Sequence, residues 1–182
     1  MKMVPDQIRR NSLAKILDDI RLKYGQLSQN STLMGLVITD SDAKVLATNT
    51  FFDTDINYWD VGAIGAALYG IGKQARDFFS ASDLKRATLI FDDKKFFVHS
   101  IGYVDVQPFP KEIVLIVIGK NKINIGLIVM LMQRASPSIK EKIKQDIDMN
   151  KTMKMSEAEF LSHINQMKRE LFVLGGIEDD LD

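Results

Sequence analysis

Residues 112–135, EIVLIVIGKNKINIGLIVMLMQRA, carry the strongest structural signal in the chain. The segment 112–119 is apolar almost throughout, which is typical of a central β-strand that is buried on both faces. Asn124 then has the side chain of a helix N-cap, and the apolar residues up to Met132 continue as a helix. The segment therefore predicts a buried strand, a turn and a helix in direct succession.

The chain upstream of this segment predicts a helix, two strands, a second helix and a hairpin. Residues 6–28 carry apolar side chains at helical spacing, whereas 33–39 and 44–50 are short strands joined by an aspartate-rich turn. The segment 58–80 has an apolar stripe and is also helical. Residues 86–92 and 95–103 form a hairpin about Asp93 and Lys94, followed by a loop that contains Pro108 and Pro110.

The chain downstream predicts an appendage to the main domain. Pro137 is expected to kink or restart the helix, with Ser136 as its cap. Ser156 and Glu159 form a capping-box pattern that opens a last helix. The predicted organisation is a main domain at 6–148, a polar linker at 149–155, a C-terminal helical extension at 156–176 and a disordered acidic tail at 177–182.

Strands that are grouped together with helices outside them indicate an antiparallel sheet and an α+β fold. The expected order is α-β-β-α-β-β-β-α, with a five-stranded antiparallel sheet between helices and one extra C-terminal helix. The chain has 182 residues, of which 46% are apolar, so it can bury a sizeable core.

Composition argues against several classes of protein. The absence of cysteine excludes disulfides and cysteine-bound zinc and favours a reducing cytoplasm. The net charge is zero, so the overall charge gives no reason to expect nucleic-acid binding. The longest apolar run, 125–132, is far shorter than the about 20 residues of a membrane span, and residues 1–10 lack the apolar region of a secretory signal.

Three segments resemble the roadblock/dynein light chain family. They are the strand pair 34–49, MGLVITDSDAKVLATN, the small-residue helix 61–75, VGAIGAALYGIGKQA, and the segment 112–135. In the last of these, residues 124–127 match the family's entry into its final helix, asparagine, any residue, glycine, leucine, and Arg134 falls where the family often has arginine. The resemblance covers residues 8–147. The chain departs from the family at Pro137, in the Pro108–Pro110 loop and in the helix from Ser156 onward.

This resemblance implies a dimer and a partner rather than a reaction. Family members join edge strands into homodimers or heterodimers with a paralogue, pack their middle helices together, and act as scaffolds or regulators of small Ras-like GTPases or as light chains of motor complexes. The resemblance further implies no enzymatic activity and no cofactor, and it indicates an archaeal or bacterial protein. The expected dimer interface comprises Gly62, Gly65, Ala66, Tyr69, Lys73, Arg86, Ala87, Leu89 and Phe91.

The residues themselves bear on this interface at two places. Glycine destabilises a helix interior by about 1 kcal/mol, so the many glycines of the helix 58–80 indicate close packing, either on a second copy or on the chain's own sheet. The uncharged strand 87–91 has basic residues before it and acidic residues after it. If it paired with its own copy about Leu89, Lys85 would face Asp93 and Arg86 would face Asp92. Alternatively, Asp93 belongs to the turn.

No catalytic or metal site can be assembled from the sequence. His99 and His163 are the only histidines, and neither has a second ligand at zinc spacing. Residues 67–74, ALYGIGKQ, fail the phosphate-loop pattern, because alanine and glutamine stand where glycine and serine or threonine are required. The paired aspartates occur at predicted turns, where aspartate caps backbone amides: Asp40 with Asp42, and Asp92 with Asp93.

Apolar side chains near the start of the middle helix and along the last helix are candidate partner-binding residues: Tyr58, Trp59, Phe160, Ile164, Met167 and Leu171. The alternative is that the last helix covers the core of its own subunit. The leading hypothesis is a non-enzymatic, dimeric scaffold or regulator of a small Ras-like GTPase. The alternatives are a small-molecule sensor or ligand-binding module and a purely structural subunit of a larger assembly.

Overall fold

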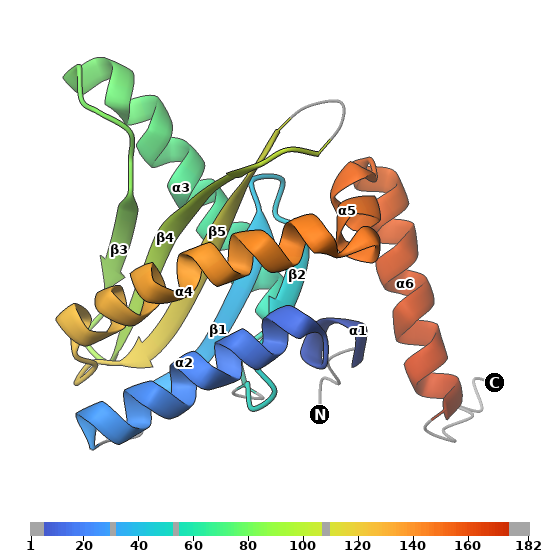
Figure 1. The fold of residues 1–182 in the computed structure, drawn as a ribbon, viewed down its shortest axis with the longest axis horizontal. Helices are drawn as coiled ribbons and strands as arrows, with labels where there is room; N and C mark the ends of the chain where they lie inside the picture. Colours follow the sequence, from blue (N-terminus) through green and yellow to red (C-terminus); the bar gives the residue numbers. More distant parts are fainter. Residues whose placement is uncertain (1–5, 30–31, 53–54, 107–109, 175–182) are drawn as a thin grey trace.

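The computed structural model describes residues 6–29, 32–52, 55–106 and 110–174. Six helices and five strands lie in this part of the chain (Figure 1). In order they are α1 (Asp6–Arg9), α2 (Ser12–Ser28), β1 (Leu33–Asp40), β2 (Val45–Thr48), α3 (Tyr58–Phe79), β3 (Arg86–Ile90), β4 (Lys94–Val104), β5 (Lys111–Lys120), α4 (Ile125–Gln145), α5 (Ile147–Lys154) and α6 (Glu157–Leu174).

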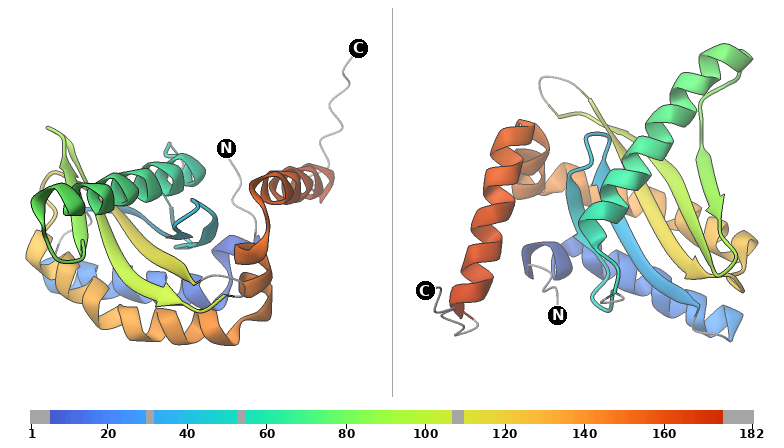
Figure 2. Two further views of the ribbon diagram at one scale, coloured as in Figure 1. Left: turned by 90° about the horizontal axis from the view of Figure 1, so that it is seen from above. Right: turned by 180° about the vertical axis from the view of Figure 1, so that it is seen from behind.

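The strands form one antiparallel sheet in the order β2-β1-β5-β4-β3. Helix α3 lies on one face of the sheet, and α2 and α4 lie side by side on the other, as Figure 2 shows from above. The predicted α+β class, the element order and the five-stranded sheet between helices are therefore confirmed. The extra C-terminal helix is present as α6, beside the sheet rather than within the layers.

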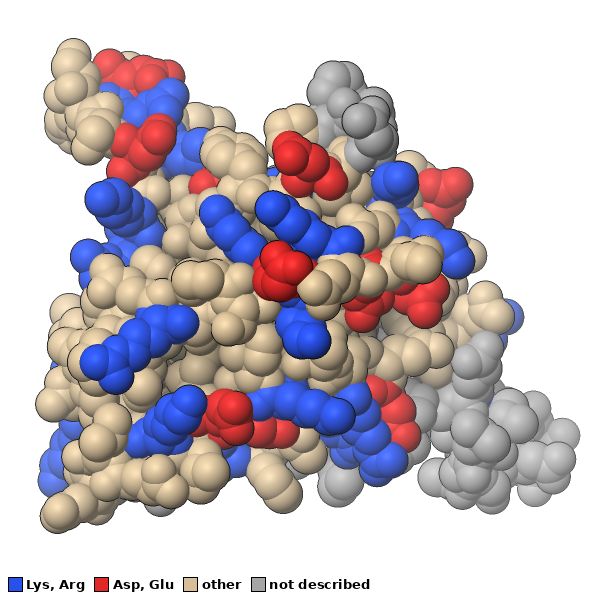
Figure 3. Space-filling view, in the orientation of Figure 1, with Lys and Arg blue, Asp and Glu red and all other residues tan. Residues whose placement is uncertain are grey.

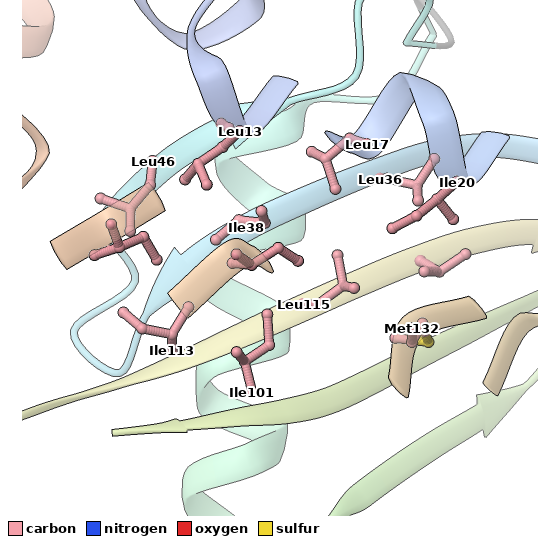
Figure 4. Close-up of a cluster of buried hydrophobic side chains, with 14 of the residues drawn as sticks. Leu13, Leu17, Ile20, Leu36, Ile38, Leu46, Ile101, Ile113, Leu115 and Met132 are labelled. Atoms are coloured by element: carbon pink, nitrogen blue, oxygen red, sulfur yellow. The ribbon is translucent and has the colours of Figure 1, made fainter. Parts of the chain in front are cut away.

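The central position of β5 explains why its sequence is apolar without alternation. Ile113, Leu115 and Val117 point into the core under α2 and α4, whereas Val114 and Ile116 point toward α3. Both sets are fully buried. The larger core lies on the α2 and α4 side, where aliphatic side chains of both helices interdigitate with those of β1, β4 and β5 (Figure 4). Burial of this apolar surface is the main force that holds the helices on the sheet.

The N-terminal helix predicted at 6–28 is wrong as a single element. Asn11 separates α1 from α2, because its side chain accepts hydrogen bonds from the amides of Leu13 and Ala14 and so caps α2. The same side chain donates to the carbonyl oxygen of Leu46 in β2, 2.8 Å away. Asn11 thereby fixes α1 against the edge strand β2.

The hairpin also differs from its predicted bounds, because β3 is shorter than 86–92 whereas β4 is longer than 95–103. Strand β3 ends at Ile90 and β4 begins at Lys94, so residues 91–93 form the turn, closed by the Phe91 amide on the carbonyl oxygen of Lys94 at 2.8 Å. Asp92 and Asp93 therefore belong to the turn and not to a strand.

The restart expected as one of two outcomes at Pro137 and the linker predicted at 149–155 are both wrong, for a common reason. Helix α4 continues through Pro137 without restarting, and the Ser136 hydroxyl donates to the Met132 carbonyl oxygen instead of capping a new helix. The segment 149–155, expected to be a linker, forms most of α5. In each case buried apolar side chains outweigh the local signal: Ile139 and Ile143 after the proline, and Met149 and Met153 in α5.

The start of the last helix is as predicted. The Ser156 amide donates to Glu159 Oε2 at 2.7 Å, and the Glu159 amide donates to Ser156 Oγ at 3.3 Å, which is a capping box. The predicted acidic tail, 177–182, lies outside the described residues.

Candidate functional site

Three residues predicted for the dimer interface, Gly62, Gly65 and Ala66, lie on the inner face of α3, which packs on the chain's own sheet. A Cβ atom on Gly65 would lie 2.2 Å from Ile116 Cδ1 of β5, and one on Gly62 would lie 2.8 Å from Val45 Cγ2 of β2. Ala66 is buried on the same face. These small residues let α3 approach its own sheet, so their assignment to the dimer interface is corrected in favour of packing within the subunit.

Tyr69 and Lys73 are likewise engaged within the subunit. The Tyr69 hydroxyl lies 2.7 Å from Glu112 Oε1, and Lys73 Nζ lies 2.8 Å from Glu112 Oε2. Ser100 donates a third hydrogen bond to Glu112 at 2.8 Å. Burial alone would raise the pKa of Glu112, but these three hydrogen bonds outweigh it and hold the pKa below its ordinary value. The network fixes β4, β5 and α3 together. It places Tyr69, which is buried, in the packing of its own subunit, whereas the place of the partly exposed Lys73 in a dimer interface stays a prediction.

The outer face of α3 is the feature that the sequence did not single out. It carries no charge over two turns and exposes Ala63, Ile64, Ala67 and Ile71, which we call the α3 outer face. Ile64 is 50% exposed and Ile71 is 65% exposed. Isolated exposed aliphatic residues are ordinary, but a contiguous stripe on one helix marks an interaction surface.

Strand β3 lies beside this surface and has an unpaired edge. The carbonyl oxygen of Lys85 and the amide of Phe91 bond toward β4, so by the alternation of antiparallel pairing the backbone groups of Arg86, Thr88 and Ile90 point away from β4. The predicted interface residues Arg86, Ala87, Leu89 and Phe91 all lie on this strand or its turn. An unpaired edge of this kind is a template for pairing with another chain.

The geometry of this edge bears on the register that the charges suggested for a self-paired strand. Pairing about Leu89 would place Arg86 opposite Asp92, but the Asp92 carbonyl oxygen already accepts a hydrogen bond from Asn121 Nδ2 at 2.7 Å. Pairing about Thr88 instead places Arg86 opposite Ile90 and uses all the outward groups of β3. The strand therefore favours a register centred on Thr88.

The opposite edge of the sheet is covered. Ile8 of α1 and Phe160 of α6 pack in one cluster with Val45 of β2, and Asn11 occupies the Leu46 carbonyl oxygen. A second chain can therefore extend the sheet at β3 but not at β2 without displacing these helices.

Helix α6 uses its apolar stripe within the subunit. Phe160, Ile164 and Met167 are buried in the cluster that also contains Tyr58 and Trp59 at the start of α3, and the rings of Trp59 and Phe160 meet edge to face at 6.0 Å. Five of the six candidate partner-binding residues are thus engaged in the chain's own packing. This agrees with the alternative stated above, that the last helix covers the core of its own subunit. The side chain of the sixth, Leu171, lies outside the described residues.

A cavity of about 380 Å³ remains where α5 and α6 meet the rest of the chain. Its lining combines apolar side chains, among them Met149, Met155 and Phe160, with polar ones such as Gln7 and His163. The helices of the extension are therefore not packed tightly against α1 and β2 along their whole length.

Near this cavity, a buried ionic group links the β1–β2 turn to α5. Lys44 Nζ donates to the Met153 carbonyl oxygen at 3.1 Å and lies 3.8 Å from Asp40 Oδ2. Asp40 Oδ1 accepts from the amides of Asp42 and Lys44, whereas Oδ2 has no hydrogen-bond partner among the described residues. Burial raises the pKa of Asp40 to about 6, against the opposing effect of its bonds and charge contacts with Lys44. No local pattern indicates the Lys44 contact, since 109 residues separate it from Met153.

The two histidines lie in different parts of the fold, His99 in β4 and His163 in α6. His99 is buried in β4, and desolvation and the Arg86 charge lower its pKa, so it is neutral at pH 7. In the described ranges of the chain, no group of three or more histidine, aspartate or glutamate side chains is gathered in a way that could hold a metal ion. Nor does any described helix combine the length and apolar character needed to cross a membrane.

Comparisons with solved structures identify the fold. The gliding protein MglB of Thermus thermophilus superposes with a TM-score of 0.58 at 10% identity, over 79% of this chain and 100% of that one. A roadblock/LC7 domain from Streptomyces avermitilis gives a TM-score of 0.54 at 16% identity, over 71% and 98%. MglB of Myxococcus xanthus gives 0.53 at 10%, over 74% and 92%. Models of protein families give no match, and curated proteins give no significant one.

These likenesses show that the chain has a roadblock-like fold, as the sequence resemblance implied. The solved structures are covered almost completely, whereas over a fifth of this chain remains outside each match.

Proposed function

We propose that this chain is a non-enzymatic, dimeric scaffold or regulator that binds a small Ras-like GTPase in the cytoplasm. The observation that carries the proposal is that two surfaces lie side by side: the edge of β3, whose outward backbone groups have no strand partner among the described residues, and the uncharged α3 outer face with its exposed apolar side chains. The roadblock-like fold supports it, since the family resemblance implies shared edge strands, paired middle helices and GTPase partners. A solved structure with this fold is described as MglB in a tetrameric arrangement, with a TM-score of 0.56.

The dimer would be built by joining two β3 strands about Thr88. The two sheets then become one, and the two α3 helices lie on the same face of it. Ile64 and Ile71 are exposed in the single chain, and contact between two copies would remove them from water. Removing apolar surface from water contributes about 25 cal/mol per Å². The outer parts of the paired α3 helices that remain would form the platform for the GTPase.

The test begins with the solution mass by light scattering. We expect the wild type near twice 20.6 kDa and the Thr88→Pro variant near 20.6 kDa, because proline removes an outward amide that a second β3 needs. Thr88→Val keeps the amide and is the matched control, expected to remain dimeric. Circular dichroism of all three should be alike, since the Thr88 amide makes no bond to β4. A monomeric wild type at micromolar concentration contradicts the dimer.

The GTPase is tested separately. Small Ras-like GTPases of the source organism, loaded with GDP or with a non-hydrolysable GTP analogue, are passed over the immobilised dimer. We expect retention of at least one of them in one nucleotide state, and loss of retention with Ala67→Glu, which places a charge in the α3 outer face. Retention of none, by a chain shown to be dimeric, refutes the GTPase and leaves a structural subunit of a larger assembly.

One observation favours a second candidate function. The cavity of about 380 Å³ under α5 and α6 is large enough for a small molecule, which fits a sensor or ligand-binding module. A screen of metabolites should then raise the melting temperature of the wild type but not of Met155→Trp, whose larger side chain fills the space. Equal shifts in both proteins would place the ligand elsewhere.

A further inference from the structure

Positive charge is concentrated on one side of this neutral chain. Residues 6–28 and 120–145, which contain α1, α2, α4 and the turn before α4, hold eleven lysines and arginines against four acids, a net of +7, whereas the whole chain sums to zero. On the face formed by α2 and α4, Lys and Arg accordingly cover more of the surface than Asp and Glu do (Figure 3). This is the side of the sheet opposite α3.

The cations on this face are not neutralised by neighbouring acids. Apart from Lys120 at the end of β5, six of them are exposed and form no ion pair with any described residue. One of the few acids on α2, Asp18, is bound to the Thr50 amide at 2.8 Å and to its hydroxyl at 2.6 Å. We call the six cations the basic face: Lys15, Lys23, Lys122, Arg134, Lys142 and Lys144.

Exposed aliphatic side chains stand among these cations. Leu22 and Leu27 of α2 are 61% and 60% exposed, and Ile125 at the start of α4 is 40% exposed. The end of α2 and the start of α4 meet there, because the Asn124 amide donates to the Tyr24 hydroxyl at 2.8 Å. Lysines 23 and 122 come from the same two ends of the helices. Apolar and cationic side chains therefore share one corner of the face.

We propose that the basic face docks on the surface of an anionic lipid bilayer. A broad layer of two helices presents its cations to the headgroups, and about 1 kcal/mol per Lys or Arg near such a surface is typical. The leucines and the isoleucine reach into the boundary between headgroups and acyl chains, where apolar side chains on a basic helix surface bind.

Other polyanions fit this face less well. Single-stranded nucleic acid is bound through aromatic side chains on which bases stack, but α4 has no aromatic residue and the one aromatic residue of α2, Tyr24, is buried. Duplex DNA is entered by a protruding helix or ribbon, whereas α2 and α4 lie flat on the sheet. Exposed leucine and isoleucine add nothing to contact with phosphates.

The inference does not rest on the proposed function, because it uses neither the α3 outer face nor the β3 edge. The two would nevertheless be compatible. In a dimer joined through β3, the basic faces of both copies lie on one side of the continuous sheet, and the α3 platform faces away from the bilayer. A bound GTPase would then be held on the solvent side of a protein that rests on the membrane.

The experiment is co-sedimentation of the full chain with vesicles. Vesicles of phosphatidylcholine alone are compared with vesicles of equal parts phosphatidylcholine and phosphatidylserine. We expect binding to the anionic vesicles only, and its loss as the salt concentration rises. The double variant Lys122→Glu with Lys142→Glu should weaken binding by about tenfold or more, given the per-residue contribution of cations at such surfaces.

A matched control separates this face from net charge. The double variant Lys85→Glu with Arg169→Glu changes the net charge equally at exposed positions outside α2 and α4, and it should bind like the wild type. Equal weakening by both double variants, or equal binding to neutral vesicles, overturns the proposal. So does binding to heparin or a DNA duplex with no binding to anionic vesicles, because the partner is then a soluble polyanion. Circular dichroism confirms that all variants are folded, since every altered side chain is exposed.

Discussion

The two faces of the β-sheet are covered by different numbers of helices and to different extents. On one face α2 and α4 together seal an aliphatic core in which Leu17, Leu115 and Ile128 are fully buried. On the other face α3 lies alone, and its outer side leaves Ile64 and Ile71 exposed. The difference indicates that two helices cover the first face within a single chain, whereas the second keeps exposed apolar side chains, which the proposed dimer would cover. Packing should therefore govern stability on one face and association on the other.

The largest expected effect on stability comes from a cavity in the core under α2 and α4. Leu17→Ala removes a fully buried side chain of α2 and should lower the free energy of unfolding by about 4 kcal/mol, the usual cost of a large aliphatic truncation with its cavity. Ile64→Ala on α3 should change it by no more than about 0.5 kcal/mol. Urea unfolding of both variants in the Thr88→Pro background keeps self-association out of the measurement. Equal losses would mean that the two faces do not differ in the single chain.

The sequence predicted the face covered by α2 and α4 better than the face covered by α3. The apolar run of β5 predicts a strand that is buried on both faces. The single apolar stripe of α2, and likewise that of α4, predicts which side of the helix faces the sheet. In α3, by contrast, glycine and alanine occur on both sides of the helix, so periodicity alone did not distinguish the inner Gly62 and Gly65 from the outer Ala63 and Ile64. The positions of Val45 and Ile116 on the strands below decide between them, since a Cβ on Gly62 would meet the first and a Cβ on Gly65 the second.

The remaining features that the sequence did not predict depend on contacts between residues far apart in the chain. Local signals found the caps at Asn124 and Ser156, because a cap is built from residues within one turn. The bond from Asn11 to Leu46 and that from Lys44 to Met153 have no local signature. These two bonds attach α1 to the edge strand and α5 to the β1–β2 turn, and they explain why the predicted helix 6–28 and the predicted linker 149–155 were wrong.

The next largest effect concerns a buried carboxyl group beside α5 whose charge changes near neutral pH. Because burial raises the pKa of Asp40 from 3.8 to about 6, the folded state binds this proton more tightly than the unfolded state. This contribution to the free energy of unfolding is fully present below a pH of about 4 and is lost as the pH rises through about 6. At 1.36 kcal/mol per pKa unit, its full size is up to about 3 kcal/mol.

This effect is isolated by subtraction. His99 acts in the opposite direction, because its pKa is lowered and its charging below pH 6.5 favours unfolding. The difference in unfolding free energy between the wild type and Asp40→Asn, measured from pH 7.5 to pH 5, removes the His99 contribution. We expect this difference to shift in favour of the wild type as the pH falls. A difference that does not vary with pH would show that Asp40 titrates normally.

The smallest expected effect compares the two sides of α3 by adding one methyl group to each. A Cβ on Gly65 would lie 2.2 Å from the side chain of Ile116, so Gly65→Ala forces that side chain to move and should cost about 1–2 kcal/mol despite the better helix propensity of alanine. A Cβ on Gly70 meets nothing within 4 Å, so Gly70→Ala should stabilise the chain by up to about 1 kcal/mol. Urea unfolding of the two variants therefore gives changes of opposite sign. Two changes of the same sign would mean that α3 can shift on the sheet to accommodate the methyl group, and that its inner face is not fixed by close contact with β5.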